Sequence, residues 1–176
     1  MPRPITEEEK LYAQELLERA QAAQRQIANL DQAGVDRAIQ AVGWATSNEK
    51  TFTRLARLGV EESGLGDWEG RPNKRFKIKG ILRDALRQKS MGIVEEIPEK
   101  GLVKYAKPVG VIAALVPTTN PALTPPGMGI YALKAKNAVV FSPHPRAKQT
   151  TFETVKVMRK ALQKIGLPVD VFVCAE

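Results

Sequence analysis

The fold is decided by an apolar run that reads Val109-Gly110-Val111-Ile112-Ala113-Ala114-Leu115-Val116. A near-continuous apolar run of this length is typical of a β-strand that is covered on both faces, as in a parallel sheet. Residues 138–141 and 169–174 form two more apolar runs, and helical patterns separate the three runs. The order strand, helix, strand, helix, strand predicts an α/β fold that contains the first part of an open, parallel, Rossmann-like sheet.

Two proline-rich turns follow the first two predicted strands. They read Pro117-Thr118-Thr119-Asn120-Pro121 and Ser142-Pro143-His144-Pro145. Open parallel sheets bind ligands beyond the carboxyl ends of their strands, so these turns are the candidate site. The sequence stops at Glu176, directly after the third strand, whereas a doubly wound sheet usually has several more strands. We therefore expect the sheet to be incomplete and the chain to be truncated.

The segment before the first strand predicts helices and a hairpin. Thr6 and Glu9 form a capping-box pattern for a long first helix, and Asp31 can cap a second. A third helix over 48–62 ends at the glycines of 63–66. Residues 92–99 and 101–106 predict a β-hairpin. We expect three parts: a helical part of the cofactor domain (1–91), a hairpin (92–107) and an incomplete βαβαβ nucleotide-binding part (108–176).

Composition limits the classes of protein to consider. The chain has 176 residues, of which 43% are hydrophobic, enough to build a core. No apolar run approaches the roughly 20 residues that span a bilayer, so a soluble, cytoplasmic protein without a membrane partner is expected. One cysteine, Cys174, and one histidine, His144, cannot supply a zinc site. We predict no metal.

The net charge of +8 is concentrated in one segment, since residues 71–89 contain eight basic residues and one acid. Their spacing predicts a fourth helix, over 74–89, with an apolar stripe that includes Phe76 and Ile78. The helix could bind nucleic acid or attract the phosphates of coenzyme A. No aromatic platform or glycine-rich RNA motif accompanies it, so a solvated amphipathic face is favoured and no nucleic-acid partner is predicted. The helical spacing of apolar residues likewise predicts that Phe152 and Val155 lie on the inward face of the last helix.

Three stretches resemble one family. They are Pro108-Val109-Gly110-Val111-Ile112 leading into 117–121, Asn137-Ala138-Val139-Val140-Phe141 leading into Ser142-Pro143-His144-Pro145-Arg146-Ala147-Lys148, and, more weakly, Glu62-Ser63-Gly64. Together they resemble the aldehyde dehydrogenases that transfer an acyl group to coenzyme A, including the aldehyde dehydrogenase half of bifunctional aldehyde-alcohol dehydrogenases. In this resemblance Phe-Ser-Pro-His-Pro marks the acylating branch, because hydrolytic relatives usually have a lysine at Ser142 and an acid at Pro145.

The resemblance implies an oxidoreductase that converts an aldehyde and coenzyme A to acyl-CoA through a cysteine thioester, with NAD or NADP as hydride acceptor. Within the full motif Asn120 would stabilise the oxyanion, whereas the residue taken alone favours a turn role before Pro121. Pro117, Thr118 and Thr119 would line the nicotinamide end of the pocket. Ser142, Pro143, His144 and Pro145 would line its adenosine end. With serine in place of lysine at 142, the choice between NAD and NADP stays open. The hairpin corresponds to a region of subunit association, which implies a homo-oligomer.

Cys174 is rejected as the nucleophile, because a cysteine at the end of an apolar strand lacks the electropositive, open setting of a reactive thiol. His144 has no carboxylate to orient it and is not expected to transfer protons. The resemblance places the nucleophile beyond this chain, so the chain alone is expected to be inactive. The alternative function is a remnant of the family that binds a nucleotide or a subunit without catalysis.

Overall fold

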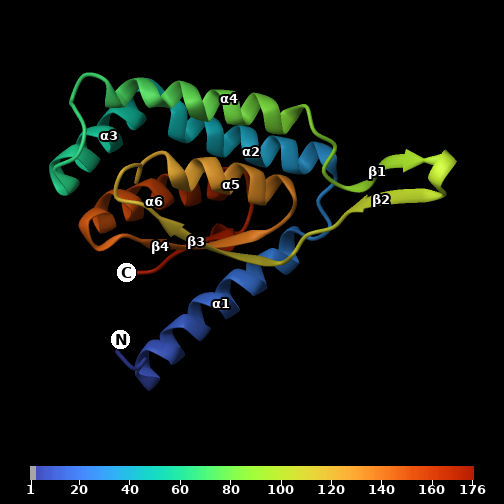
Figure 1. The fold of residues 1–176 in the computed structure, drawn as a ribbon, viewed down its shortest axis with the longest axis horizontal. Coiled ribbons are helices and arrows are strands. Elements are labelled where there is room, and N and C mark those ends of the chain that lie inside the picture. The colour runs from blue at the N-terminus through green and yellow to red at the C-terminus, as the bar shows by residue number, and fades with distance from the viewer. Residues whose placement is uncertain (1–2) are drawn as a thin grey trace.

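The computed structural model describes residues 3–176 and shows a mixed α/β fold (Figure 1). Met1 and Pro2, which begin the predicted 1–91 part, lie outside the described residues. The helices are α1 (Glu7–Ile27), α2 (Gln32–Ser47), α3 (Glu49–Ser63), α4 (Arg75–Leu86), α5 (Thr124–Lys134) and α6 (Lys148–Lys164). The strands are β1 (Gly92–Ile97), β2 (Leu102–Ala106), β3 (Val111–Val116), β4 (Ala138–Pro143) and β5 (Phe172–Cys174). None of the helices of residues 3–176 is long and apolar enough to cross a membrane.

The predicted helix starts are confirmed at the level of hydrogen bonds. The Thr6 hydroxyl accepts from Glu9 N, and the Glu9 carboxylate accepts from Thr6 N at 2.9 Å, which is a complete capping box. Asp31 caps α2 by accepting from Gly34 N at 2.7 Å. Helix α3 ends at Gly64, whose φ of 68° is the left-handed conformation that glycine adopts without steric cost.

The predicted parallel sheet is confirmed, with β4 between β3 and β5. Helices α5 and α6 cover one face of the sheet and α2 packs on both helices, while α1 lies across the other face (Figure 1). The main core between these layers includes Ile39, Phe52, Phe141 and Phe172, all of which are fully buried. A smaller apolar cluster joins α1 to the opposite face of the sheet through Leu16 and Ala20.

Side-chain contacts connect these layers at specific points. The Asn137 carboxamide oxygen accepts from Val109 N at 2.7 Å and Gly110 N at 2.9 Å, so the residue before β4 also fixes the start of β3. The ammonium of Lys136 donates to Ala28 O at 2.8 Å and thereby satisfies a carbonyl at the carboxyl end of α1. Lys134 of α5 is almost fully buried and pairs with Asp36 of α2. These contacts order the elements that position the carboxyl edge of the sheet.

The predicted hairpin is present and projects away from the layers (Figure 1). Strands β1 and β2 pair antiparallel around a short 3-10 turn, Pro98–Lys100, which ends at Gly101 with a φ of 62°. Four large apolar side chains of the hairpin are exposed: Val94, Leu102, Val103 and Tyr105. The hairpin therefore presents an apolar surface that the described residues do not cover.

Three burial predictions were wrong. Strand β3 was predicted to be covered on both faces, but Leu115 is 81% exposed, because α1 covers the sheet over Val111 and does not reach Leu115. Phe76 is 54% exposed rather than inward, and Arg75 lies over its ring at 4.3 Å from the ring centroid. That stacking gives an exposed ring a favourable cationic partner. Phe152 is also exposed, because this part of α6 lines an open cavity beside α1.

Candidate functional site

The two proline-rich turns lie side by side at one edge of the sheet. Strands β3 and β4 run in register, with Val116 opposite Pro143, so both strands end at the same level. His144 N donates to Val116 O at 3.1 Å and ties the second turn to the first strand. The structure therefore brings together the predicted segments 117–120 and 142–145, which are separated in the sequence by α5 and most of β4.

The first turn is closed by backbone hydrogen bonds. Asn120 N donates to Pro117 O at 3.3 Å, and Asn120 O accepts from Thr124 N at 2.9 Å, where α5 begins. Pro117 and Thr119 are exposed, whereas Thr118 is half-buried. Within residues 3–176, Thr118 Oγ1 is buried and has no hydrogen-bond partner. An orphaned hydroxyl is costly, so this turn carries an unsatisfied polar atom beside an exposed rim.

The side-chain amide of Asn120 accepts a hydrogen bond from a lysine. Lys74, at the end of the 3-10 helix Arg71–Lys74, donates from Nζ to Asn120 Oδ1 at 2.6 Å. Asn120 Nδ2 approaches Thr119 Oγ1 at 3.3 Å on the exposed side. Burial lowers the pKa of the Lys74 ammonium, and the neighbouring charge of Arg71 lowers it further. The amide oxygen is thus engaged, and the amide nitrogen is on the solvent side with a weak partner.

The second turn is exposed and also closed on itself. Ser142 and Pro143 were predicted to begin this turn, but they are the last two residues of β4, because both still pair with β3. Ser142, His144 and Pro145 are exposed, and Pro143 is half-buried. His144 Nδ1 accepts from Arg146 N at 3.1 Å, so the neutral ring carries its proton on Nε2. Among the hydrogen bonds of residues 3–176, no carboxylate contacts the ring. His144 therefore offers an exposed N–H donor, and the geometry gives it no proton-transfer partner.

The Glu62-Ser63-Gly64 stretch fastens this second turn to α3. The Glu62 carboxylate accepts from Gln149 N at 2.8 Å and from Thr150 N at 2.8 Å, so it caps α6 from another helix. Arg146 Nη2 donates to Ser63 O at 2.6 Å. The sequence contained one signal of this arrangement: α6 begins after Ala147, which has no side chain to cap it, so its amides need a distant acceptor.

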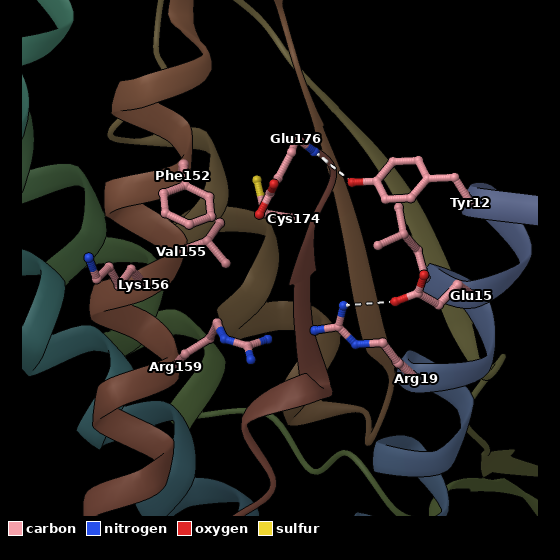
Figure 2. Close-up of a pocket in the computed structure, with 10 residues that line it drawn as sticks. Tyr12, Glu15, Arg19, Phe152, Val155, Lys156, Arg159, Cys174 and Glu176 are labelled. Atoms are coloured by element: carbon pink, nitrogen blue, oxygen red, sulfur yellow. Dashed lines mark hydrogen bonds and ion pairs between the residues drawn. The ribbon is translucent and has the colours of Figure 1, made fainter. Parts of the chain in front are cut away.

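Cys174 lies in a different place, in a cavity of about 400 Å³ between α1 and α6 (Figure 2). Tyr12 and Arg19 of α1 face Phe152 and Arg159 of α6 across this cavity. Burial and, to a smaller extent, the charge of Glu176 raise the pKa of the Cys174 thiol to about 11. A thiol with this pKa is poorly nucleophilic near neutral pH. None of the eight predicted site residues lines this cavity.

An ion-pair network beside this cavity joins α1 to the core. Asp170 accepts from Arg19 Nη2 at 3.0 Å and from Arg159 Nη1 at 2.6 Å. Burial raises the pKa of Asp170, but the hydrogen bonds from the two guanidinium groups outweigh that effect, so its pKa lies below the ordinary value. Among residues 3–176, no group of three or more His, Cys, Asp or Glu side chains could hold a metal ion.

Comparison with known proteins agrees with this arrangement. Residues 5–175 match the sequence profile of the aldehyde dehydrogenase family. A sulfoacetaldehyde dehydrogenase from Acholeplasma sp is 44% identical over 155 residues, which cover 88% of this chain and 32% of the relative. The chain therefore spans about a third of the length of this relative.

Solved structures show the same relationship. An acetylating aldehyde dehydrogenase from Geobacillus thermoglucosidasius superposes with a TM-score of 0.86 and 32% identity, covering 97% of this chain and 38% of that one. A propionaldehyde dehydrogenase from Rhodopseudomonas palustris, solved with bound CoA and an acylated cysteine, gives a TM-score of 0.77 at 31% identity over 92% of this chain and 36% of that one. An engineered glycolyl-CoA reductase solved with bound NADP+ gives a TM-score of 0.74 at 30% identity, covering 92% of this chain and 36% of that one. The chain belongs to the aldehyde dehydrogenase family, in which it is homologous to the N-terminal part of the CoA-acylating type.

Proposed function

We propose that this chain is the N-terminal, cofactor-binding portion of an NAD(P)-dependent oxidoreductase that converts an aldehyde and coenzyme A to acyl-CoA through a cysteine thioester. The observation that carries the proposal is the common edge formed by the turns after β3 and β4, where Val116 lies opposite Pro143. Relatives solved with NADP+ and with CoA support the ligand classes. In this reading residues 108–176 bind the nucleotide and residues 1–91 support them.

The residues of the edge fit a nicotinamide nucleotide. Pro117, Thr119, Ser142 and His144 are exposed along it, so an extended ligand can lie on both turns without displacing a side chain. We assign 117–119 to the nicotinamide end and 142–145 to the adenosine end. Bound here, NAD or NADP supplies the hydride acceptor, and coenzyme A supplies the thiol that takes the acyl group. The exposed N–H of His144 is a donor for the adenosine side of the ligand.

Asn120 is the catalytic residue that this chain contributes. Its amide nitrogen is on the exposed side of the first turn, where an N–H can donate to the aldehyde oxygen as that oxygen becomes negatively charged. A fixed donor at such an oxygen contributes more in the transition state than in the bound substrate and therefore raises kcat. The nucleophilic cysteine is supplied by another part of the enzyme, because the raised pKa of Cys174 keeps that thiol protonated. The 176-residue chain alone is therefore inactive in this proposal.

The hairpin is proposed to associate subunits of a homo-oligomer. Its exposed apolar side chains, among them Leu102, Val103 and Tyr105, support this role, since apolar area of this kind is usually covered in an assembly. Deleting residues 92–106 and measuring the mass of the particles in solution would test the assignment. An unchanged oligomer after the deletion would refute it.

Product analysis tests the reaction itself. The full-length product of the gene that encodes this sequence is incubated with an aldehyde, NAD or NADP, and coenzyme A, and both acyl-CoA and free acid are measured. Sulfoacetaldehyde is the first aldehyde to try, because it names the activity of a relative that is 44% identical. The proposal predicts acyl-CoA in amounts equal to the reduced nicotinamide formed. Free acid made at the same rate without coenzyme A would refute the acylating assignment, and nucleotide binding without turnover would favour a non-catalytic remnant.

A further inference from the structure

The side chain of Asn120 could donate or accept at the site, depending on which way its amide points. The backbone of the residue is fixed, because its N–H and its C=O are both used in the turn and at the start of α5. Rotation of the amide plane by half a turn would exchange Oδ1 and Nδ2 with little change of shape. Only the partners of the two atoms decide which one is presented to the exposed side.

Those partners favour one orientation. Lys74 Nζ lies 2.6 Å from Asn120 Oδ1, and an ammonium group has three donors and no acceptor. A flipped amide would place Nδ2 against the ammonium and lose a hydrogen bond to a charged donor, which is stronger than a neutral one. On the other side, the contact of Asn120 Nδ2 with Thr119 Oγ1 is 3.3 Å long and exposed. The lysine therefore directs the N–H groups of the amide toward the exposed edge.

The contact also changes the strength of the donor. A positive charge beside the amide oxygen draws electron density from the nitrogen, so each N–H becomes a better hydrogen-bond donor. Lys74 and Asn120 are 46 residues apart and come from the segment before α4 and the turn after β3. The pairing therefore depends on how the 3-10 helix Arg71–Lys74 packs against α3 and α4, within reach of the turn after β3.

We infer that Lys74 is a positioning residue of the proposed acyl-transfer site, which holds and polarises the Asn120 amide so that it donates to the oxyanion. The inference rests on the proposed function and adds to it a residue that acts through Asn120 without touching substrate. It also separates Lys74 from the other basic residues of the 71–89 segment. The side chain of Lys77, one turn along, is exposed and makes no hydrogen bond or ion pair within residues 3–176.

A double-mutant cycle on the full-length gene product tests the inference. Asn120→Ala is expected to lower kcat roughly a hundredfold, which is typical for loss of one oxyanion donor. Lys74→Met keeps the aliphatic stem and is expected to lower kcat roughly tenfold with little change in KM for the aldehyde, since ground-state binding is not affected. In the Asn120→Ala background, Lys74→Met should lower kcat by less than about twofold, because Lys74 acts through the Asn120 amide, which this background lacks.

Two further variants separate positioning from charge and from folding. Lys77→Met removes the same charge nearby and should keep kcat within about twofold of wild type, as expected for an exposed side chain. Lys74→Arg keeps a cationic donor and should lose less kcat than Lys74→Met, which would exclude a general packing defect. A wild-type protein without CoA-dependent activity would overturn the proposed function and this inference with it. If the wild type is active but Lys74→Met lowers kcat tenfold in both the wild-type and the Asn120→Ala backgrounds, the inference alone is overturned.

Discussion

The carboxylate of Glu62 is the only cap that the first turn of α6 has within the described residues, and its removal should loosen the turn that carries His144. The structure gives it three hydrogen bonds, from Gln149 N, Thr150 N and the Thr150 hydroxyl, at 2.8, 2.8 and 2.6 Å. Loss of a helix cap costs about 1 to 2 kcal/mol, and loss of a negative charge at a helix amino end costs about 0.5 kcal/mol more. For the half-buried Glu62 we expect about 2 kcal/mol for Glu62→Ala.

Amide hydrogen exchange measures this effect where it occurs. A change of about 2 kcal/mol corresponds to a roughly thirtyfold larger opening constant, so the amides of Gln149 and Thr150 should exchange roughly thirtyfold faster in Glu62→Ala. Glu61→Ala is the matched control, because Glu61 is the neighbouring, exposed acid and its side chain makes no hydrogen bond in residues 3–176. Equal exchange rates at Gln149 and Thr150 in the two variants would refute the capping role of Glu62.

Three more outcomes follow from packing and charge. Gly129→Ala should lower the free energy of unfolding by about 1 to 2 kcal/mol, because an added Cβ would lie 2.5 Å from Met158 Cε and 3.0 Å from the ring of Phe172, and this overpacking outweighs the gain in helix propensity. In Gly80→Ala the added Cβ meets open space, so the free energy of unfolding should rise by about 0.5 to 1 kcal/mol. Urea unfolding that shows the same sign for both variants would contradict this. Cys174 should react with iodoacetamide far more slowly than a free thiol at pH 8, and its reaction rate should rise until the pH reaches the thiol pKa of about 11. A fast reaction at neutral pH would contradict its rejection as the nucleophile. The pKa of Asp170 is depressed in the folded state, so its contribution to stability is complete above its ordinary pKa and is lost as the pH falls through the folded pKa. Asp170→Asn should therefore unfold at a lower urea concentration than wild type at pH 7, and the two midpoints should differ least at low pH. A difference between the midpoints that does not change with pH would refute the ion-pair assignment.

Local signals in the sequence were sufficient for the elements and their order. The capping box at Thr6, the αL glycine at Gly64 and the alternation of apolar strands with helical patterns each depend on residues a few positions apart. Because the rules for parallel strands then place the strand ends together, the common edge of residues 117–121 and 142–145 was also predictable.

Long-range contacts account for what the sequence did not show. Lys74 was one of eight basic residues in its segment, and only the packing of the 3-10 helix Arg71–Lys74 against α3 and α4 identifies it as the partner of Asn120. Burial was misjudged for Phe76 because helical spacing indicates an apolar stripe but does not show where the buried part of that stripe ends. Phe76 lies at the exposed edge of the stripe, beside cationic side chains. Leu115 was misjudged because an apolar strand does not reveal how far the covering helix extends.

Threonine-methyl NMR of the full-length gene product would test the central claim most directly, namely that the turns at the common edge bind the nucleotide. On addition of NAD or NADP, we predict that the Thr118 and Thr119 signals shift, while the signal of Thr46, buried in α2, stays in place as an internal reference. Binding of the nucleotide with Thr118 and Thr119 unmoved would contradict the claim and would redirect the search to another surface, such as the cavity beside Tyr12 and Arg159.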